Sequence, residues 1–245
     1  MSDSVAKIEG ARPDGGKCPR PPRHNYQRDL EYIIRGLEKQ GEAPTLLLHA
    51  CCAPCSSYCL EYLSNYFRIT VFYYNPNIAP EKEYQLRVAE IKRFVSEIKT
   101  KYPVTLIEGK YEPRRFYDYV KGLENEPEGG ARCRKCFELR LSESVKLARE
   151  LGMDYVTTSL TISPLKDAQV LNDVVQEQCD LVGGVKRLPT DFKKKGGYKR
   201  STELSEKHGL YRQNFCGCVF SMRKADCKSK VNLVKFLNYI VCTTR

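Results

Sequence analysis

Hydrophobic residues form two alternating patterns through most of the chain. Short runs rich in Leu, Val, Ile and aromatic residues are typical of buried strands. They lie at residues 46–48, 69–74, 104–107, 155–158 and, more weakly, 185–188. Between them, apolar residues recur every three or four positions, which predicts helices that begin near Leu30, Pro54, Pro80, Cys133 and Ser163. This alternation predicts an α/β fold with a mostly parallel, Rossmann-like sheet and helices on both faces.

The same pattern predicts a single catalytic domain at residues 25–221. Residues 1–24 contain Gly, Pro and basic residues without periodicity, so we expect a disordered tail there, and a C-terminal tail at 222–245. No apolar run approaches the ~20 residues that span a bilayer. The first residues also lack the basic and apolar blocks of a signal peptide. We therefore expect a cytoplasmic protein that makes no membrane contact.

The chain contains twelve cysteines. In a reducing compartment, clustered thiols are more often metal ligands or redox groups than disulfides. Seven fall into three groups, each at a predicted strand end, helix start or glycine turn: Cys51-Cys52-x-x-Cys55, Cys133-x-x-Cys136 and Cys216-Gly-Cys218. Helix N-termini also favour the thiolate over the thiol. The other five are isolated and are expected to be incidental or buried: Cys18, Cys59, Cys179, Cys227 and Cys242.

Seven grouped thiols exceed the need of one structural zinc, which takes four ligands. An iron–sulfur cluster also takes four cysteines, and three would then remain for a further metal or for redox chemistry. A dithiol–disulfide centre at Cys52 and Cys55 would not explain the other two pairs. The spacing alone therefore leaves an iron–sulfur cluster, zinc and thiol redox chemistry open.

The net charge of +11 is concentrated in one part of the chain. Residues 186–230 hold thirteen Lys and Arg against four Asp and Glu, a local charge of +9. Such a stretch attracts phosphates and is typical of a nucleic-acid partner. A solvated loop that keeps the protein soluble is the alternative.

Five segments resemble, in this order, the QueH-type epoxyqueuosine reductases. They are His-x-Cys-Cys-Ala-Pro-Cys at 49–55, Phe-Tyr-Tyr-Asn-Pro-Asn-Ile at 72–78, Arg-Cys-x-x-Cys-Phe at 132–137, Thr-x-x-Thr-Ile-Ser-Pro at 158–164 and Tyr-Arg-Gln-Asn-Phe-Cys-Gly-Cys at 211–218. The resemblance implies a bacterial enzyme with a nucleotide α-hydrolase-like fold. It also implies the reaction, reduction of the epoxide of epoxyqueuosine at the wobble position of tRNA, which is the last step of queuosine biosynthesis.

The resemblance further implies two metal cofactors, a 4Fe-4S cluster and an additional iron. Family members can carry Asp where this chain has Cys55, which favours Cys55 as a ligand of the separate iron. The resemblance does not assign the other six cysteines to one metal or the other. They are Cys51, Cys52, Cys133, Cys136, Cys216 and Cys218. Removal of the epoxide oxygen consumes two electrons, so the implied partners are tRNA and an electron donor of unknown identity.

A proton donor must lie within hydrogen-bonding reach of the epoxide oxygen, which leaves as water. The candidates from the sequence are His49, Tyr211 and Asp191. A hydrogen-bonded histidine at a strand end is an equally good interpretation of His49.

The modified base is expected to stack on Tyr73 or Tyr74, with Asn75 next to them, because bases of single-stranded RNA commonly stack on aromatic rings. Ordinary packing within the strand is the alternative for both tyrosines. The basic stretch is expected to hold the phosphates of the anticodon stem-loop, through Lys193, Lys194, Lys199 and Arg200.

Two other classes of protein compete with this interpretation. An α/β tRNA sulfur-transfer or adenylating enzyme would need a glycine-rich phosphate loop after the first strand, where this chain has Cys-Cys-Ala-Pro-Cys. ATP use is therefore disfavoured. A zinc-stabilised RNA-binding protein without enzymatic activity would be colourless, whereas an iron–sulfur protein is brown.

Overall fold

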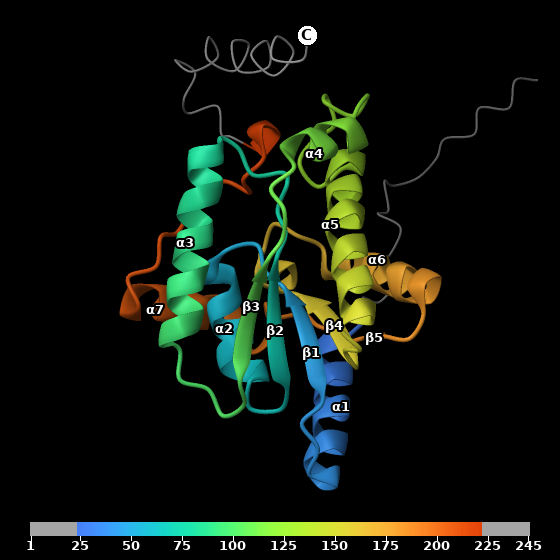
Figure 1. The fold of residues 1–245 in the computed structure, drawn as a ribbon, viewed down its shortest axis with the longest axis vertical. Helices are drawn as coiled ribbons and strands as arrows, with labels where there is room; N and C mark the ends of the chain where they lie inside the picture. The colour runs from blue at the N-terminus through green and yellow to red at the C-terminus, as the bar shows by residue number, and fades with distance from the viewer. Residues whose placement is uncertain (1–23, 222–245) are drawn as a thin grey trace, which may run out of the picture.

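A computed structural model describes residues 24–221 (Figure 1). The tails predicted at 1–24 and 222–245, with Cys18, Cys227 and Cys242, lie outside the described residues apart from His24. The described part contains a sheet of five strands in the order β3-β2-β1-β4-β5, and all four pairings are parallel. The predicted α/β class with a parallel Rossmann-like sheet is confirmed.

The strands match the hydrophobic runs of the sequence closely. Their bounds are β1 Thr45–His49, β2 Arg68–Tyr73, β3 Val104–Glu108, β4 Tyr155–Thr158 and β5 Lys186–Arg187. The chain first runs outward from β1 to β3 and then returns to place β4 on the other side of β1. Ligands of such sheets bind outside the carboxyl ends of the strands at this point of reversal. In this protein that position is the end of β1, where Cys51 and Cys52 follow.

Two layers of helices cover the sheet. Helices α1 Tyr26–Gln40, α2 Ala53–Leu63 and α3 Glu81–Glu97 pack on one face, and α5 Ala131–Glu150 and α6 Ala168–Val182 pack on the other. Figure 1 shows α2 and α3 separated from α5 and α6 by the sheet. Alternate residues of β1 point to opposite faces of the sheet. Leu46 and Leu48 pack in the hydrophobic core on one face, and Leu47 packs in the core on the other. All three leucines are fully buried.

Some elements differ from the sequence prediction. The helix expected at Ser163 begins only at Ala168, where the Asp167 side chain accepts a hydrogen bond from the Gln169 amide, and a 3₁₀ turn, η1 Ser159–Ile162, precedes it. Two helices were not predicted, α4 Pro113–Tyr119 and α7 Gly197–Lys207. Short 3₁₀ turns, η2 Lys194–Gly196 and η3 Val219–Ser221, complete the described elements. Among these elements, none is a helix with the length and apolar character needed to span a bilayer.

Helix α7 lies directly against α2, and a glycine permits this approach. A Cβ atom on Gly197 would lie 2.1 Å from the carbonyl oxygen of Phe192 and 2.5 Å from the ring of Tyr58. Arg200 then joins the two helices through two hydrogen bonds to the Glu61 carboxylate, at 2.9 and 2.7 Å. The basic segment after β5 is therefore an ordered part of the domain.

We expect Gly197→Ala to lower the free energy of unfolding by about 1–3 kcal/mol, because the added methyl group forces backbone and ring atoms apart. Urea denaturation measures this difference. Gly36→Ala is the matched control, since Gly36 lies in α1 with nothing within 4 Å of an added Cβ. That control should be neutral or slightly stabilising. Equal stability of the two variants would contradict the close contact at Gly197.

Candidate metal centre and adjoining cavity

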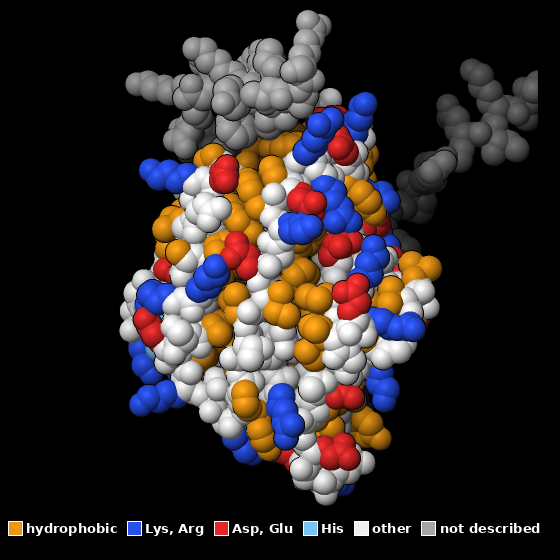
Figure 2. Space-filling model, viewed as in Figure 1, with side chains coloured by type: hydrophobic (Ala, Val, Ile, Leu, Met, Phe, Trp, Pro, Cys, Tyr) orange, Lys and Arg blue, Asp and Glu red, His pale blue; other side chains and the backbone are white. Residues whose placement is uncertain are grey.

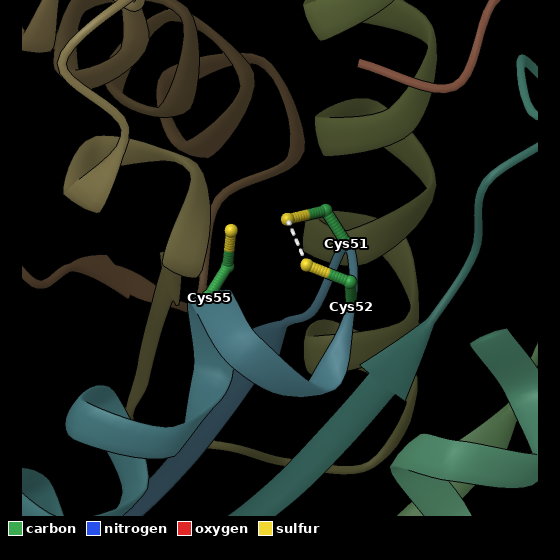
Figure 3. Close-up of side chains that lie close together, drawn as sticks. All are labelled: Cys51, Cys52 and Cys55. Carbon is green, nitrogen blue, oxygen red and sulfur yellow. Dashed lines mark hydrogen bonds between the residues drawn. The ribbon is translucent and has the colours of Figure 1, made fainter. Parts of the chain in front are cut away.

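Three cysteine sulfurs converge just beyond the end of β1. Cys51 and Cys52 lie in the turn that leaves the strand, and Cys55 lies in the first turn of α2, where Pro54 occupies a position that needs no N–H donor. The three Sγ atoms lie within 4.8 Å of one another, and those of Cys51 and Cys52 are 3.8 Å apart. Figure 3 shows the three side chains pointing into one space. We call these residues the cysteine triad.

The three thiols of the triad differ in how readily they lose a proton. Hydrogen bonds from Cys52 and Cys55 hold the pKa of Cys51 well below its usual value. The interaction with Cys51 raises the pKa of Cys52 to about 12, and interactions with Cys51 and Cys52 raise that of Cys55. The triad therefore carries one thiolate easily, but three only beside a cation. This donor set fits a thiolate-ligated metal ion, since thiolates are the metal-binding form of cysteine.

The other four grouped cysteines line a second space. A cavity of about 140 Å³ has Cys133, Cys136, Cys216 and Cys218 in its wall; we call it the four-cysteine cavity. Cys133 and Cys136 come from the first turns of α5, and Cys136 and Cys218 share an apolar cluster with Phe116. All the cysteines of the described residues are free thiols. Four cysteines around one cavity fit the donor set of an iron–sulfur cluster.

The spacing of Cys216 and Cys218 depends on the glycine between them. Gly217 has φ +117°, a conformation that other residues rarely adopt. Its carbonyl oxygen accepts a hydrogen bond from the Ala79 amide at 2.9 Å, which ties the turn to the loop after β2. The narrow Cys-x-Cys spacing is thereby compatible with two thiols in one cavity wall.

Two buried arginines lie beside the thiols. Arg140 in α5 is 1% exposed, and its guanidinium donates to Cys136 Sγ at 3.9 Å and to Asn75 Oδ1 at 2.5 Å. Arg87 in α3 is equally buried, forms an ion pair with Glu83 and donates to the carbonyl oxygen of Cys216 at 3.4 Å. These cations offset the charge of nearby thiolates. Sequence reasoning missed both, because an arginine within a helix normally indicates a solvated face.

A third space joins the two thiol groups. This cavity of about 430 Å³ is lined by residues that include Cys51, Cys55, Cys216, Lys166 and Phe215; we call it the triad cavity. Cys216 and Lys166 also line the four-cysteine cavity, so the two spaces adjoin. A volume of this size is within the roughly 300–1,000 Å³ of small-molecule sites.

The three proton-donor candidates lie in different surroundings. His49 is fully buried, where its Nε2 donates to the carbonyl oxygen of Tyr74 at 3.2 Å and its Nδ1 accepts from the Thr158 hydroxyl at 2.9 Å. Burial and nearby Arg140 lower the pKa of His49 to about 3. This environment supports the interpretation of His49 as a neutral, hydrogen-bonded histidine at a strand end.

The other two candidates are engaged elsewhere. The Tyr211 hydroxyl is 3.3 Å from the Glu83 carboxylate, and the ring is 38% exposed. Asp191 forms an ion pair with Lys193 at 2.8 Å and lines another cavity, of about 520 Å³, which we call the side cavity. Neither residue is in the wall of the triad cavity.

The aromatic and amide candidates for substrate binding lie inside the protein. Tyr73 is fully buried, with its ring beside that of Tyr84, and Tyr74 is 3% exposed and stacked on Phe72. Neither offers a free ring face to a base, so packing within the strand, the alternative interpretation, describes them better. Asn75 is also buried, and its Nδ2 donates to the carbonyl oxygen of Ala50 at 2.9 Å.

The basic candidates divide into paired and unpaired side chains. Lys193 and Arg200 are held by ion pairs with Asp191 and Glu61. Lys194 and Lys199 are exposed. Two aromatic residues that were missed from the sequence, Tyr198 and Phe215, line the triad cavity.

The fold and these thiols define a class, a parallel α/β protein with a cluster of cysteines that could bind a metal at the carboxyl edge of its sheet. Residues 46–224 match the family model described as "Epoxyqueuosine reductase QueH". The chain belongs to this family.

Curated relatives carry the same description. One from Streptococcus pyogenes is 46% identical over 204 residues, covering 81% of this chain and 78% of the relative. One from Staphylococcus epidermidis is 45% identical, covering 82% of this chain and 85% of the relative. A more distant relative from Haemophilus influenzae is 34% identical over 221 residues, covering 90% of this chain and 89% of the relative.

The environment of His49 predicts a specific pH dependence. Its pKa is lower in the folded protein than in the unfolded chain, where it is about 6.5. The unfolded chain therefore binds the extra proton as the pH falls, and stability is lost from pH 6.5 downward. Between pH 7 and pH 5, wild type should lose about 2 kcal/mol more unfolding free energy than His49→Gln, as measured by urea denaturation. Parallel losses in both proteins would mean that His49 is not buried in its neutral form.

Proposed function

We propose that this protein reduces epoxyqueuosine in tRNA to queuosine. Family membership over most of the chain supports the reaction, and the named relatives are epoxyqueuosine reductases. The observation that carries the proposal is the triad cavity, which has Cys51, Cys55 and Cys216 in its wall. A cavity of ligand size is thereby bordered by both thiol groups.

We assign one of the two metal cofactors to each group of cysteines. Cys133, Cys136, Cys216 and Cys218 would hold a 4Fe-4S cluster, and Cys51, Cys52 and Cys55 would hold the additional iron. When bound, the cluster would supply electrons singly and the iron a Lewis acid for the epoxide oxygen. The protein's own contribution is to orient the thiolates and to balance their charge. Gln213 helps to orient the thiolate of Cys52, because its Nε2 donates to Cys52 Sγ at 3.0 Å.

The tRNA is proposed to approach over the segment after β5. Exposed Lys194 and Lys199 are placed to contact phosphates, and Tyr198 and Phe215 in the cavity wall are placed to contact the modified base. The face shown in Figure 2 is a poor alternative, because basic and acidic side chains are intermixed there without a continuous basic patch.

The proposal includes the domain organisation, the compartment and the electron donor that the sequence predicts. A single domain at residues 25–221 holds the whole site, the compartment is the cytoplasm, and an external one-electron donor completes the reaction. The competing zinc-protein interpretation is weaker because the six cysteines that line these two adjoining cavities exceed the four ligands of one zinc site.

The reaction itself can be tested directly. Protein purified without oxygen should be brown, and with a chemical one-electron reductant it should convert epoxyqueuosine to queuosine in tRNA from a strain that lacks the enzyme. Nucleoside analysis by mass spectrometry detects the loss of one oxygen atom. A colourless protein with one zinc and no conversion would rule out the proposal.

The division of the cysteines gives a second prediction. Cys136→Ala should abolish the broad absorption near ~400 nm of an iron–sulfur cluster. Cys55→Ala should keep that absorption and lose the separate iron, whereas Cys55→Asp should retain the iron, because a carboxylate can also bind it. Cys179→Ala is the control, since Cys179 is buried in α6 among apolar residues. Loss of iron from that control, or of the absorption from Cys55→Ala, would refute the assignment.

A further inference from the structure

Lys166 lies where the cavities of this protein meet. It lines the four-cysteine cavity, the triad cavity and the side cavity. Its position is in the loop between η1 and α6, which follows β4 at the carboxyl edge of the sheet. Like the triad, this loop lies at the point where the strand order reverses. A single side chain therefore borders both thiol groups and the space open to a ligand.

The loop that carries Lys166 is fixed by a second lysine. Lys193 Nζ donates to the carbonyl oxygens of Thr161 at 2.9 Å and Lys166 at 3.3 Å, and it also forms the ion pair with Asp191. On the other side, Asp167 caps the start of α6. The backbone of Lys166 is thus held in place. Lys193, paired with Asp191, thereby helps to position this loop.

The ammonium group of Lys166 is charged and has no direct protein partner. Within the described residues, no hydrogen bond or ion pair involves its Nζ atom. A lysine side chain carries a positive charge at neutral pH, since its usual pKa is about 10.4. A charged donor next to a ligand-sized cavity, with its hydrogen bonds unused, is available to a substrate.

We propose that Lys166 is a catalytic residue whose ammonium group donates a hydrogen bond to the epoxide oxygen of the substrate. Negative charge builds on this oxygen as its bonds to carbon break. A fixed cation at that point stabilises the transition state more than the ground state. The inference rests on the proposed function and adds the group that holds the leaving oxygen.

The reaction balances with Lys166 in this role. Both carbon–oxygen bonds of the epoxide break and a carbon–carbon double bond forms. Two electrons come from an external one-electron donor protein, and two protons come from water. The oxygen leaves as water, and Lys166 is unchanged at the end of the cycle. Because the product lacks the oxygen, the hydrogen bond distinguishes substrate from product.

This difference provides a test that needs no turnover. Metal-loaded protein is kept without reductant, and its affinity is measured for anticodon stem-loops that carry epoxyqueuosine or queuosine. Wild type should prefer the epoxyqueuosine stem-loop by about ten-fold, as a charged hydrogen bond predicts. Lys166→Met should remove this preference, and Lys166→Arg should retain most of it. Lys194→Met, a change at an exposed lysine, should weaken both stem-loops equally.

The rate supplies a second measurement. With reductant, Lys166→Met should lower kcat by about 10²–10³-fold with little change in KM, as for loss of a donor to a developing oxyanion. The iron content and cluster absorption of the variant should match wild type. A retained preference in Lys166→Met, or a loss of its metals, would overturn the inference, the latter because Lys166 would then serve the metal site. If wild type performs no reduction, the proposed function fails as well.

Discussion

Negative charge crowded onto closely spaced sulfur atoms is the constraint on which this site depends. In the cysteine triad, the pKa of Cys51 is lowered, whereas interactions with its neighbours raise the pKa values of Cys52 and Cys55, so the group cannot ionise fully without positive charge nearby. The protein supplies part of that charge through Arg140 and Arg87, which are buried beside the other thiols. A buried guanidinium without compensation is costly. The cations and the sulfur atoms therefore stabilise each other, and a bound metal would complete the balance.

The parallel sheet brings these groups together from distant parts of the chain. Its strands end at one edge, so the turn after β1, the loop after β4 and the first turns of α5 meet there. The point of strand reversal, which in related folds receives a nucleotide phosphate, here receives thiols. Pro54 and Cys55 occupy the helix start that such a phosphate would need. One architecture thus serves a different chemistry because of a few residues in one turn.

Hydrophobic periodicity was sufficient to predict the sheet and its covering helices, because these depend on local patterns that repeat along each element. The grouping of the cysteines could also be predicted, since each group lies next to a recognisable break. Individual side-chain roles could not. Lys193 and Arg200 belong to a basic stretch in the sequence, but their partners Asp191 and Glu61 become apparent only in three dimensions.

The roles of the aromatic residues and of the missed cations also depend on contacts that form only in three dimensions. Tyr73 lies in a strand covered on both faces, where sequence cannot distinguish a ring that packs from one that binds. Arg140 and Lys166 have ordinary surroundings in the sequence, and their importance comes from the sulfur atoms that folding places beside them. Charges that act across long sequence separations leave no local pattern.

The segment at 212–218 has one more consequence. It provides Cys216 and Cys218 to the four-cysteine cavity, and Gln213 and Phe215 to the wall of the triad cavity. Under the proposed assignment of the cysteines, the same short stretch of backbone would hold one cofactor and shape the space for the substrate. Assembly of the cofactor and formation of the substrate space would then be coupled, so that cofactor insertion would also influence substrate recognition.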